Sequence, residues 1–169
     1  MSQDIKKIGI PSAIVTSALL LMSPMLALAQ NPHFIGTPTI DKSLSGTTAT
    51  ITTSGKVAGL GSDPTDFFLT TSGVTAETEC DNPGKGANPP GQDATFGPTT
   101  GQTTTITPKN GQITFNDAGA LSITVTAEQA GCPGKQQPVV TSATFEDVTL
   151  HLVQNGEEVL TFDFGTIDP

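Results

Sequence analysis

The sequence contains no arginine, and its few lysines are outnumbered by acidic residues. Residues 30–169 hold five Lys against fifteen Asp and Glu, a net charge of 5 − 15 = −10, and the whole chain carries −9. Binding to nucleic acid or to anionic lipid headgroups needs Lys and Arg side chains clustered against phosphates. We therefore expect no nucleic-acid partner, and we interpret the acidity as favouring solubility.

Tryptophan and tyrosine are also absent. These two residues and Arg are the usual anchors of binding surfaces, because each combines a large buried area with a polar group. A sugar-binding face lined by Trp is therefore excluded. Phenylalanine is the only aromatic residue, and we predict that all eight copies belong to the hydrophobic core: Phe34, Phe67, Phe68, Phe96, Phe115, Phe145, Phe162 and Phe164.

The first 29 residues have the layout of a secretory signal peptide. A charged start is followed by an apolar stretch over Ala13–Met22 and by Ala27-Leu28-Ala29, which predicts cleavage before Gln30. No second long apolar run follows, so we expect no membrane insertion after cleavage. The sequence therefore predicts a secreted protein, extracellular or at the cell surface, with residues 30–169 forming a single domain.

Cys80 and Cys132 are the only cysteines. In an oxidising compartment, two isolated cysteines favour a structural disulfide over a reactive thiol or a metal site. A redox centre would need a close Cys-x-x-Cys pair, which is missing. We therefore predict a Cys80–Cys132 disulfide.

Short segments of alternating apolar and polar residues recur along residues 30–169, with Gly, Pro and Asn between them. In Thr47–Val57, for example, Ala49, Ile51 and Thr53 alternate with threonines. No helical period of ten or more residues is convincing. The pattern predicts an all-β fold: a two-layer β-sandwich, immunoglobulin-like or jelly-roll-like, of about 7–9 antiparallel strands.

Turn-forming residues give two further expectations. Asn155-Gly156 lies between alternating runs and predicts a C-terminal β-hairpin with a type I′ turn. Residues 81–101 are rich in Pro, Gly and Asn and predict a long loop, which either carries function or is an excursion pinned by Cys80.

Residues suited to chemistry are few and scattered. His33 and His151 are the only histidines, and the alternation of Leu150 and Leu152 places His151 on the solvent face of a strand. Asp163 and Asp168, with Asp41, are weak candidates for Ca²⁺ ligands, and the two histidines are weak candidates for Zn²⁺. No nucleophile elbow or phosphate-binding loop occurs. We therefore predict no cofactor and no enzymatic activity.

Several sequence blocks resemble a group of short secreted prokaryotic proteins that have no assigned activity. The resemblance spans nearly all of residues 30–169 and implies one autonomous exported domain. It lies in the segments Asn31-Pro32-His33-Phe34, Ala58-Gly59-Leu60-Gly61, Cys80-Asp81-Asn82-Pro83-Gly84, Pro89-Pro90-Gly91-Gln92, residues 106–115 and residues 160–167.

The expected function is a noncatalytic extracellular module, structural or adhesive, with self-association or a cell-surface partner. One alternative is a small-ligand, Ca²⁺-binding or Zn²⁺-binding protein that uses residues 81–101 as a lid. Two further alternatives are a subunit of a strand-exchanged surface fibre and a hydrolase whose site is assembled from distant residues.

Overall fold

The computed structural model describes residues 31–82 and 88–168, so the predicted signal peptide lies outside the described residues. Within these two ranges the chain contains strands and no helix, and therefore no helix long and apolar enough to cross a membrane. In chain order the strands are β1 (His33–Phe34), β2 (Thr39–Ser45), β3 (Thr48–Ala58), β4 (Thr65–Thr71), β5 (Gly73–Asp81), β6 (Ala94–Phe96), β7 (Thr99–Thr100), β8 (Thr104–Ile106), β9 (Gln112–Thr124), β10 (Gln137–Gln154) and β11 (Glu157–Ile167).

The strands form two antiparallel sheets, one of four strands and one of seven, which confirms the predicted all-β sandwich. In the smaller sheet β9 pairs along the length of β3, and β2 and β1 pair in succession with the other edge of β3. In the larger sheet β10 is central. It pairs with β11 on one side and with β4 and β5 on the other, and β6, β7 and β8 line the outer edge of β4 and β5.

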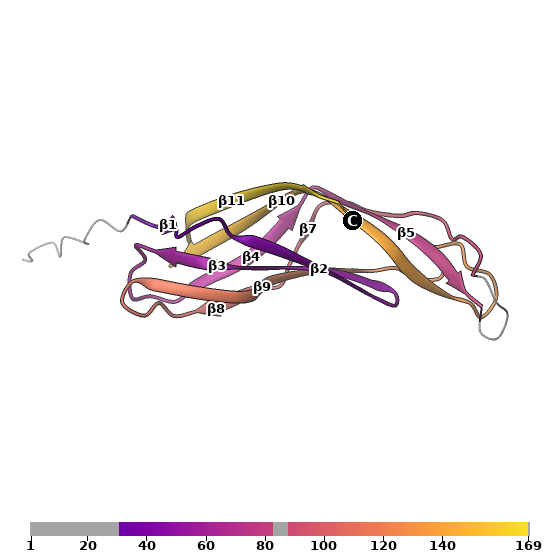
Figure 1. Cartoon of the computed structure of the whole chain (residues 1–169), viewed down its shortest axis with the longest axis horizontal. Helices are drawn as coiled ribbons and strands as arrows, with labels where there is room; N and C mark the ends of the chain where they lie inside the picture. The colour runs from indigo at the N-terminus through magenta and orange to yellow at the C-terminus, as the bar shows by residue number, and fades with distance from the viewer. Residues whose placement is uncertain (1–30, 83–87, 169) are drawn as a thin grey trace, which may run out of the picture.

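A long two-stranded ribbon runs through the larger sheet. β4 pairs with residues 149–154 of β10 and β5 pairs with residues 137–146, so β4 and β5 follow one another along the same edge. At about 3.3 Å per residue, the 18 residues of β10 span about 60 Å. Figure 1 shows the result: the two sheets overlap over one half of the molecule, while β5 and the start of β10 extend to the other end.

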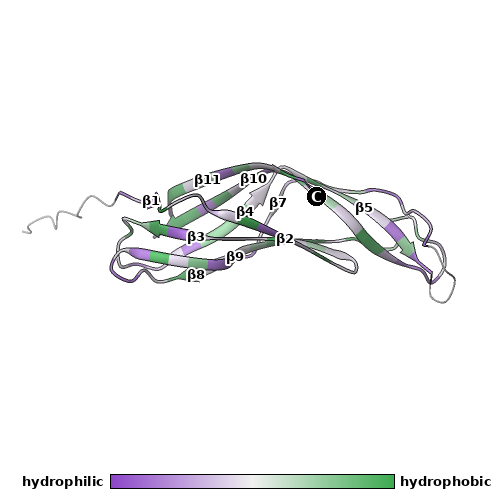
Figure 2. Cartoon of the chain, viewed as in Figure 1, coloured by the Kyte–Doolittle hydropathy of each residue, from purple (hydrophilic) through white to green (hydrophobic). Residues whose placement is uncertain are grey.

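Most of the core lies between the sheets in the half where they overlap, and it continues along β5 and the start of β10 with small residues such as Ala76, Ala94 and Val140. Residues facing inward alternate with outward polar residues, and Figure 2 shows this alternation as changing colour along the strands. The largest fully buried side chains are Phe67, Phe115, Phe145, Ile51, Leu69, Leu121, Leu150, Leu152, Val57, Val74, Val125 and Val148. Buried apolar area of this kind is the main source of folding free energy.

Two sequence predictions about local structure are confirmed in detail. In β3 the predicted alternation is present, and the face that carries Ala49, Ile51 and Thr53 is fully buried. The C-terminal hairpin forms with Asn155 and Gly156 at its turn, and both have positive φ, 55° and 79°. Such a turn is favoured because its twist matches that of the two strands.

Three expectations need correction. Residues 81–101 are not one long loop, since Asp81 ends β5 and the segment contains β6 and β7. Pairing with the edges of β5 and β4 supplies backbone hydrogen bonds that the Pro and Gly content did not predict. Phe68 is not in the core, because it lies on the outer face of β4 against His151. The described residues form eleven strands rather than about 7–9, because short strands such as β6, β7 and β8 form on edges that longer strands offer.

The predicted disulfide is present. Cys80 at the end of β5 is bonded to Cys132, with the two Cα atoms 5.5 Å apart. Cys132 belongs to an irregular segment that precedes β10. The bond therefore ties this segment to the ribbon at the end where only one sheet is present.

Candidate functional site

The residues proposed from the sequence as metal ligands do not assemble into a metal centre. His33 in β1 has its Nδ1 2.8 Å from the carbonyl oxygen of Asn31. Asp163 accepts a hydrogen bond from the amide of Gly165, and Asp168 is exposed beyond β11. Over residues 31–82 and 88–168, no three His, Cys, Asp or Glu side chains converge on a point where a metal ion could bind.

His151 instead lies in a polar array on the outer face of the larger sheet. Its Nε2 is 2.9 Å from the hydroxyl of Thr70 on β4, and its Nδ1 is 2.5 Å from a carboxylate oxygen of Glu158 on β11. The ring is stacked on Phe68 with centroids 5.0 Å apart. As the sequence predicted, His151 faces away from buried Leu150 and Leu152, but these neighbours leave its side chain only 20% exposed.

The order Thr70, His151, Glu158 resembles a nucleophile, a base and an orienting carboxylate. Acyl transfer also needs backbone N–H groups directed at the developing oxyanion. Thr70 pairs with Thr149 on one side and with Thr100 on the other, so its own peptide group is surrounded by the sheet. The geometry therefore fits a set of structural polar contacts between β4, β10 and β11 better than it fits a catalytic centre.

The segment proposed as a lid is held against β5. The amide of Cys80 donates to the carbonyl of Pro89, and the amide of Gly91 donates to the carbonyl of Thr78. The hydroxyl of Thr78 donates to the carbonyl of Gln92, whose own amide donates to Ala130 beside the disulfide. Of the two expectations for this segment, these contacts favour an excursion pinned to β5 rather than a lid. Residues 83–87 of the segment lie outside the described residues.

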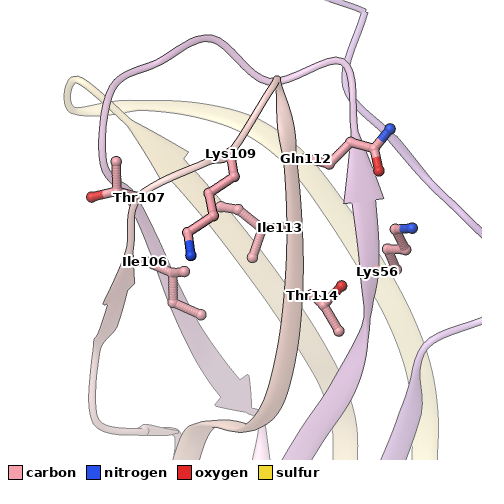
Figure 3. Close-up of a pocket in the computed structure, with 7 residues that line it drawn as sticks. All are labelled: Lys56, Ile106, Thr107, Lys109, Gln112, Ile113 and Thr114. Carbon is pink, nitrogen blue, oxygen red and sulfur yellow. The ribbon is translucent and has the colours of Figure 1, made fainter.

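A hollow of about 420 Å³ lies where the chain crosses from the larger sheet to the smaller one. Its apolar part is formed by Ile106 of β8 and Ile113 of β9, and its rim carries two lysines, two threonines and a glutamine (Figure 3). The lining residues are Lys56, Ile106, Thr107, Lys109, Gln112, Ile113 and Thr114. They include no carboxylate and no member of the His151 array.

Sequence reasoning missed both the partners of His151 and this hollow. The Asn155-Gly156 turn sets the β10–β11 register, so it offered one signal that Glu158 lies near His151. The position of Thr70 depends on β4–β10 pairing across about 80 residues, and no local pattern encodes it. Lys109 lies in the crossing from β8 to β9, and Lys56 reaches the same hollow because β3 pairs with β9, where Lys56 is opposite Thr114.

Comparisons with known proteins give no family. No family model matches the chain, and no curated protein matches it. Among solved structures it is similar to the crystal structure of a Bacteroides uniformis beta-glucuronidase, at 15% identity and a TM-score of 0.33. The alignment covers 79% of this chain and 14% of the glucuronidase chain, a likeness too distant to carry an argument about function.

Proposed function

We propose that the protein is a noncatalytic secreted module with a structural or adhesive role outside the cytoplasm. The observation that carries the proposal is the elongated ribbon of β4–β5 and β10, clasped at its far end by Cys80–Cys132. An extended ribbon of this kind suits a spacer or a display element. The disulfide is compatible with an oxidising compartment.

Two experiments test this proposal. Cells that express the whole chain should release it or display it at the surface, and mass spectrometry should find Gln30 at its N-terminus. An Ala29→Glu variant is the control and should remain unprocessed, because signal peptidase needs a small residue before the cleavage site. Cytoplasmic retention with Met1 present would contradict the proposed location, and turnover of any substrate in a broad hydrolase panel would contradict the noncatalytic role.

Self-association through a strand edge belongs to the same proposal. Within the part of the chain that the structure describes, β2, β9 and β11 are the longer strands that pair on one side only. β1 and β2 pair with β3 of the same chain, which favours intramolecular pairing of residues 33–45 over donation to a neighbouring subunit. Glu157, Glu158 and Asp163 on β11 place acidic charge along that edge of the larger sheet, a common protection against edge pairing.

A hydrolase is the second candidate, and the Thr70–His151–Glu158 array is the observation that favours it. Nitrophenyl esters of increasing acyl length serve as probes. If the array is catalytic, Thr70→Val and His151→Gln each abolish turnover, and Thr124→Val, at an exposed threonine of the smaller sheet, leaves it unchanged. The noncatalytic proposal predicts the same slow background for all four proteins.

A further inference from the structure

The hollow between β8 and β9 combines positive charge with an apolar wall. Ile113 is only 3% exposed, so the apolar surface open to a ligand comes mainly from Ile106, which is partly buried and packs against the core. In Figure 3 the ammonium group of Lys109 lies between the two isoleucines, and Lys56 lies beyond Thr114. A ligand that fills the hollow would therefore meet hydrocarbon and an ammonium group together.

The residues that line the hollow carry positive charge, whereas the net charge of the chain is negative. Acidic residues outnumber basic ones by 16 to 7, yet two lysines and no acidic residue line the hollow. Among the described residues, neither ammonium group makes a hydrogen bond or lies within ion-pair distance of a carboxylate. Lys42 differs, since its Nζ donates to the carbonyl oxygen of Ala143, 3.2 Å away. Lys56 and Lys109 are thus free to pair with a ligand.

We propose that this hollow binds a small organic carboxylate with an apolar body. Lys109 would donate to the carboxylate, Lys56 would add to the positive potential, and the hydrocarbon would pack mainly on Ile106. The hydroxyls of Thr107 and Thr114 and the amide of Gln112 are further donors at the rim. This assignment goes beyond the structural role and does not depend on it.

The test uses residues 30–169, isotopically labelled for nuclear magnetic resonance, with hexanoate as the probe. Hexanol is its neutral counterpart and inorganic phosphate is an anion without hydrocarbon. We expect saturable shifts from hexanoate at the amides of residues 106–114. Binding of hexanol and of phosphate should each be at least about tenfold weaker, because a charge-assisted contact and the apolar contact are each worth about that factor.

A double variant, Lys56→Gln with Lys109→Gln, should bind hexanoate at least about tenfold more weakly and keep the wild-type melting temperature. Lys135→Gln is the matched control. It removes an exposed lysine beside the disulfide and should leave hexanoate binding unchanged. The assignment would be overturned if hexanol bound as well as hexanoate, or if phosphate bound more tightly. It would also be overturned by shifts spread over the whole surface, or by equal losses of hexanoate binding in the double variant and the control.

Discussion

Single residues hold the two sheets together at a few close contacts. The rings of Phe67 on β4 and Phe115 on β9 have centroids 4.9 Å apart, and neither ring is more than 1% exposed. This pair joins the larger sheet to the smaller one. Its surroundings are tight, because a Cβ atom added at Gly55 would lie 2.8 Å from the ring of Phe115.

Replacing Phe115 with Ala should therefore lower the free energy of unfolding by about 3–5 kcal/mol, through lost burial and the cavity left behind. Thr114→Ala, at the exposed neighbouring position, should change it by less than about 0.5 kcal/mol. Urea unfolding followed by far-ultraviolet circular dichroism measures both, since the chain offers no Trp or Tyr fluorescence. Similar losses in the two variants would show that the ring does not sit in the core.

Two glycines with the same backbone conformation allow a second comparison at this scale. Gly36 and Gly59 both have φ of +76°, but a Cβ atom at Gly36 meets nothing within 4 Å, whereas one at Gly59 meets the carbonyl group of Asn31. Gly36→Ala should cost about 1–2 kcal/mol, the penalty of left-handed backbone. Gly59→Ala should cost about 1–3 kcal/mol more, because the segment before β1 must move. Equal melting temperatures for the two variants would contradict this difference.

The sequence predicted which residues face the core better than it predicted the polar contacts of the outer face. Alternation placed Ile51, Leu150 and Leu152 inward, and they are fully buried. The same alternation placed His151 outward but was silent about its neighbours. Its contacts with Phe68 and Thr70 come from a strand paired across the sheet, so they depend on tertiary register rather than on local pattern.

Among the elements, those defined by their own turns were the most predictable. The β10–β11 hairpin follows from Asn155-Gly156, and the turn before β9 follows from Asn110-Gly111, where φ is also positive at both residues. β6 and β7 were not predicted, because strands of two or three residues form only where a longer strand offers an edge. The bulges of β9 at Asp117 and Gly119 likewise depend on its pairing with β3.

The disulfide acts at the level of elements, since it joins the end of β5 to the segment before β10. Replacing both cysteines with Ala should lower stability by about 4 kcal/mol in the chain-entropy model. Hydrogen exchange should quicken first in residues 88–97 and 128–136, while β3 and β9 keep their protection. The control is added reductant, which should destabilise the wild type and leave the double variant unchanged. Uniformly faster exchange would contradict a local clasp.

At the scale of the whole molecule, the ribbon makes the domain long for its size. A compact chain of 140 residues would have a radius of gyration of about 14 Å, whereas one strand alone spans about 60 Å. Small-angle X-ray scattering of residues 30–169 should give a larger radius and a maximum dimension of at least about 60 Å. Values typical of a compact sphere would contradict the extended arrangement of β5 and β10.

This elongation was beyond the reach of the sequence. Alternation and turns predicted two layers of strands, and the structure confirms them. They did not predict that β4 and β5 follow one another along a single edge of β10. Ser72-Gly73 between them has the composition of a turn, which favours a reversal of the chain at that point. The chain instead continues past Ser72, whose amide donates to the carbonyl of Glu146, next to the bulge that β10 makes against β11 between Phe145 and Val148.

The ribbon also has a consequence for how quickly the native state is reached. Cys80 of β5 is paired with Pro138, and Thr65 of β4 with Gln154, so the two sides of the ribbon are separated by roughly 60–90 residues of chain. Domains dominated by such distant pairings fold in milliseconds to seconds rather than microseconds. The β10–β11 hairpin closes over two residues and can form early. Its long partners, β4 and β5, must then find β10 through a slow search, during which the edge of that hairpin is exposed to other chains.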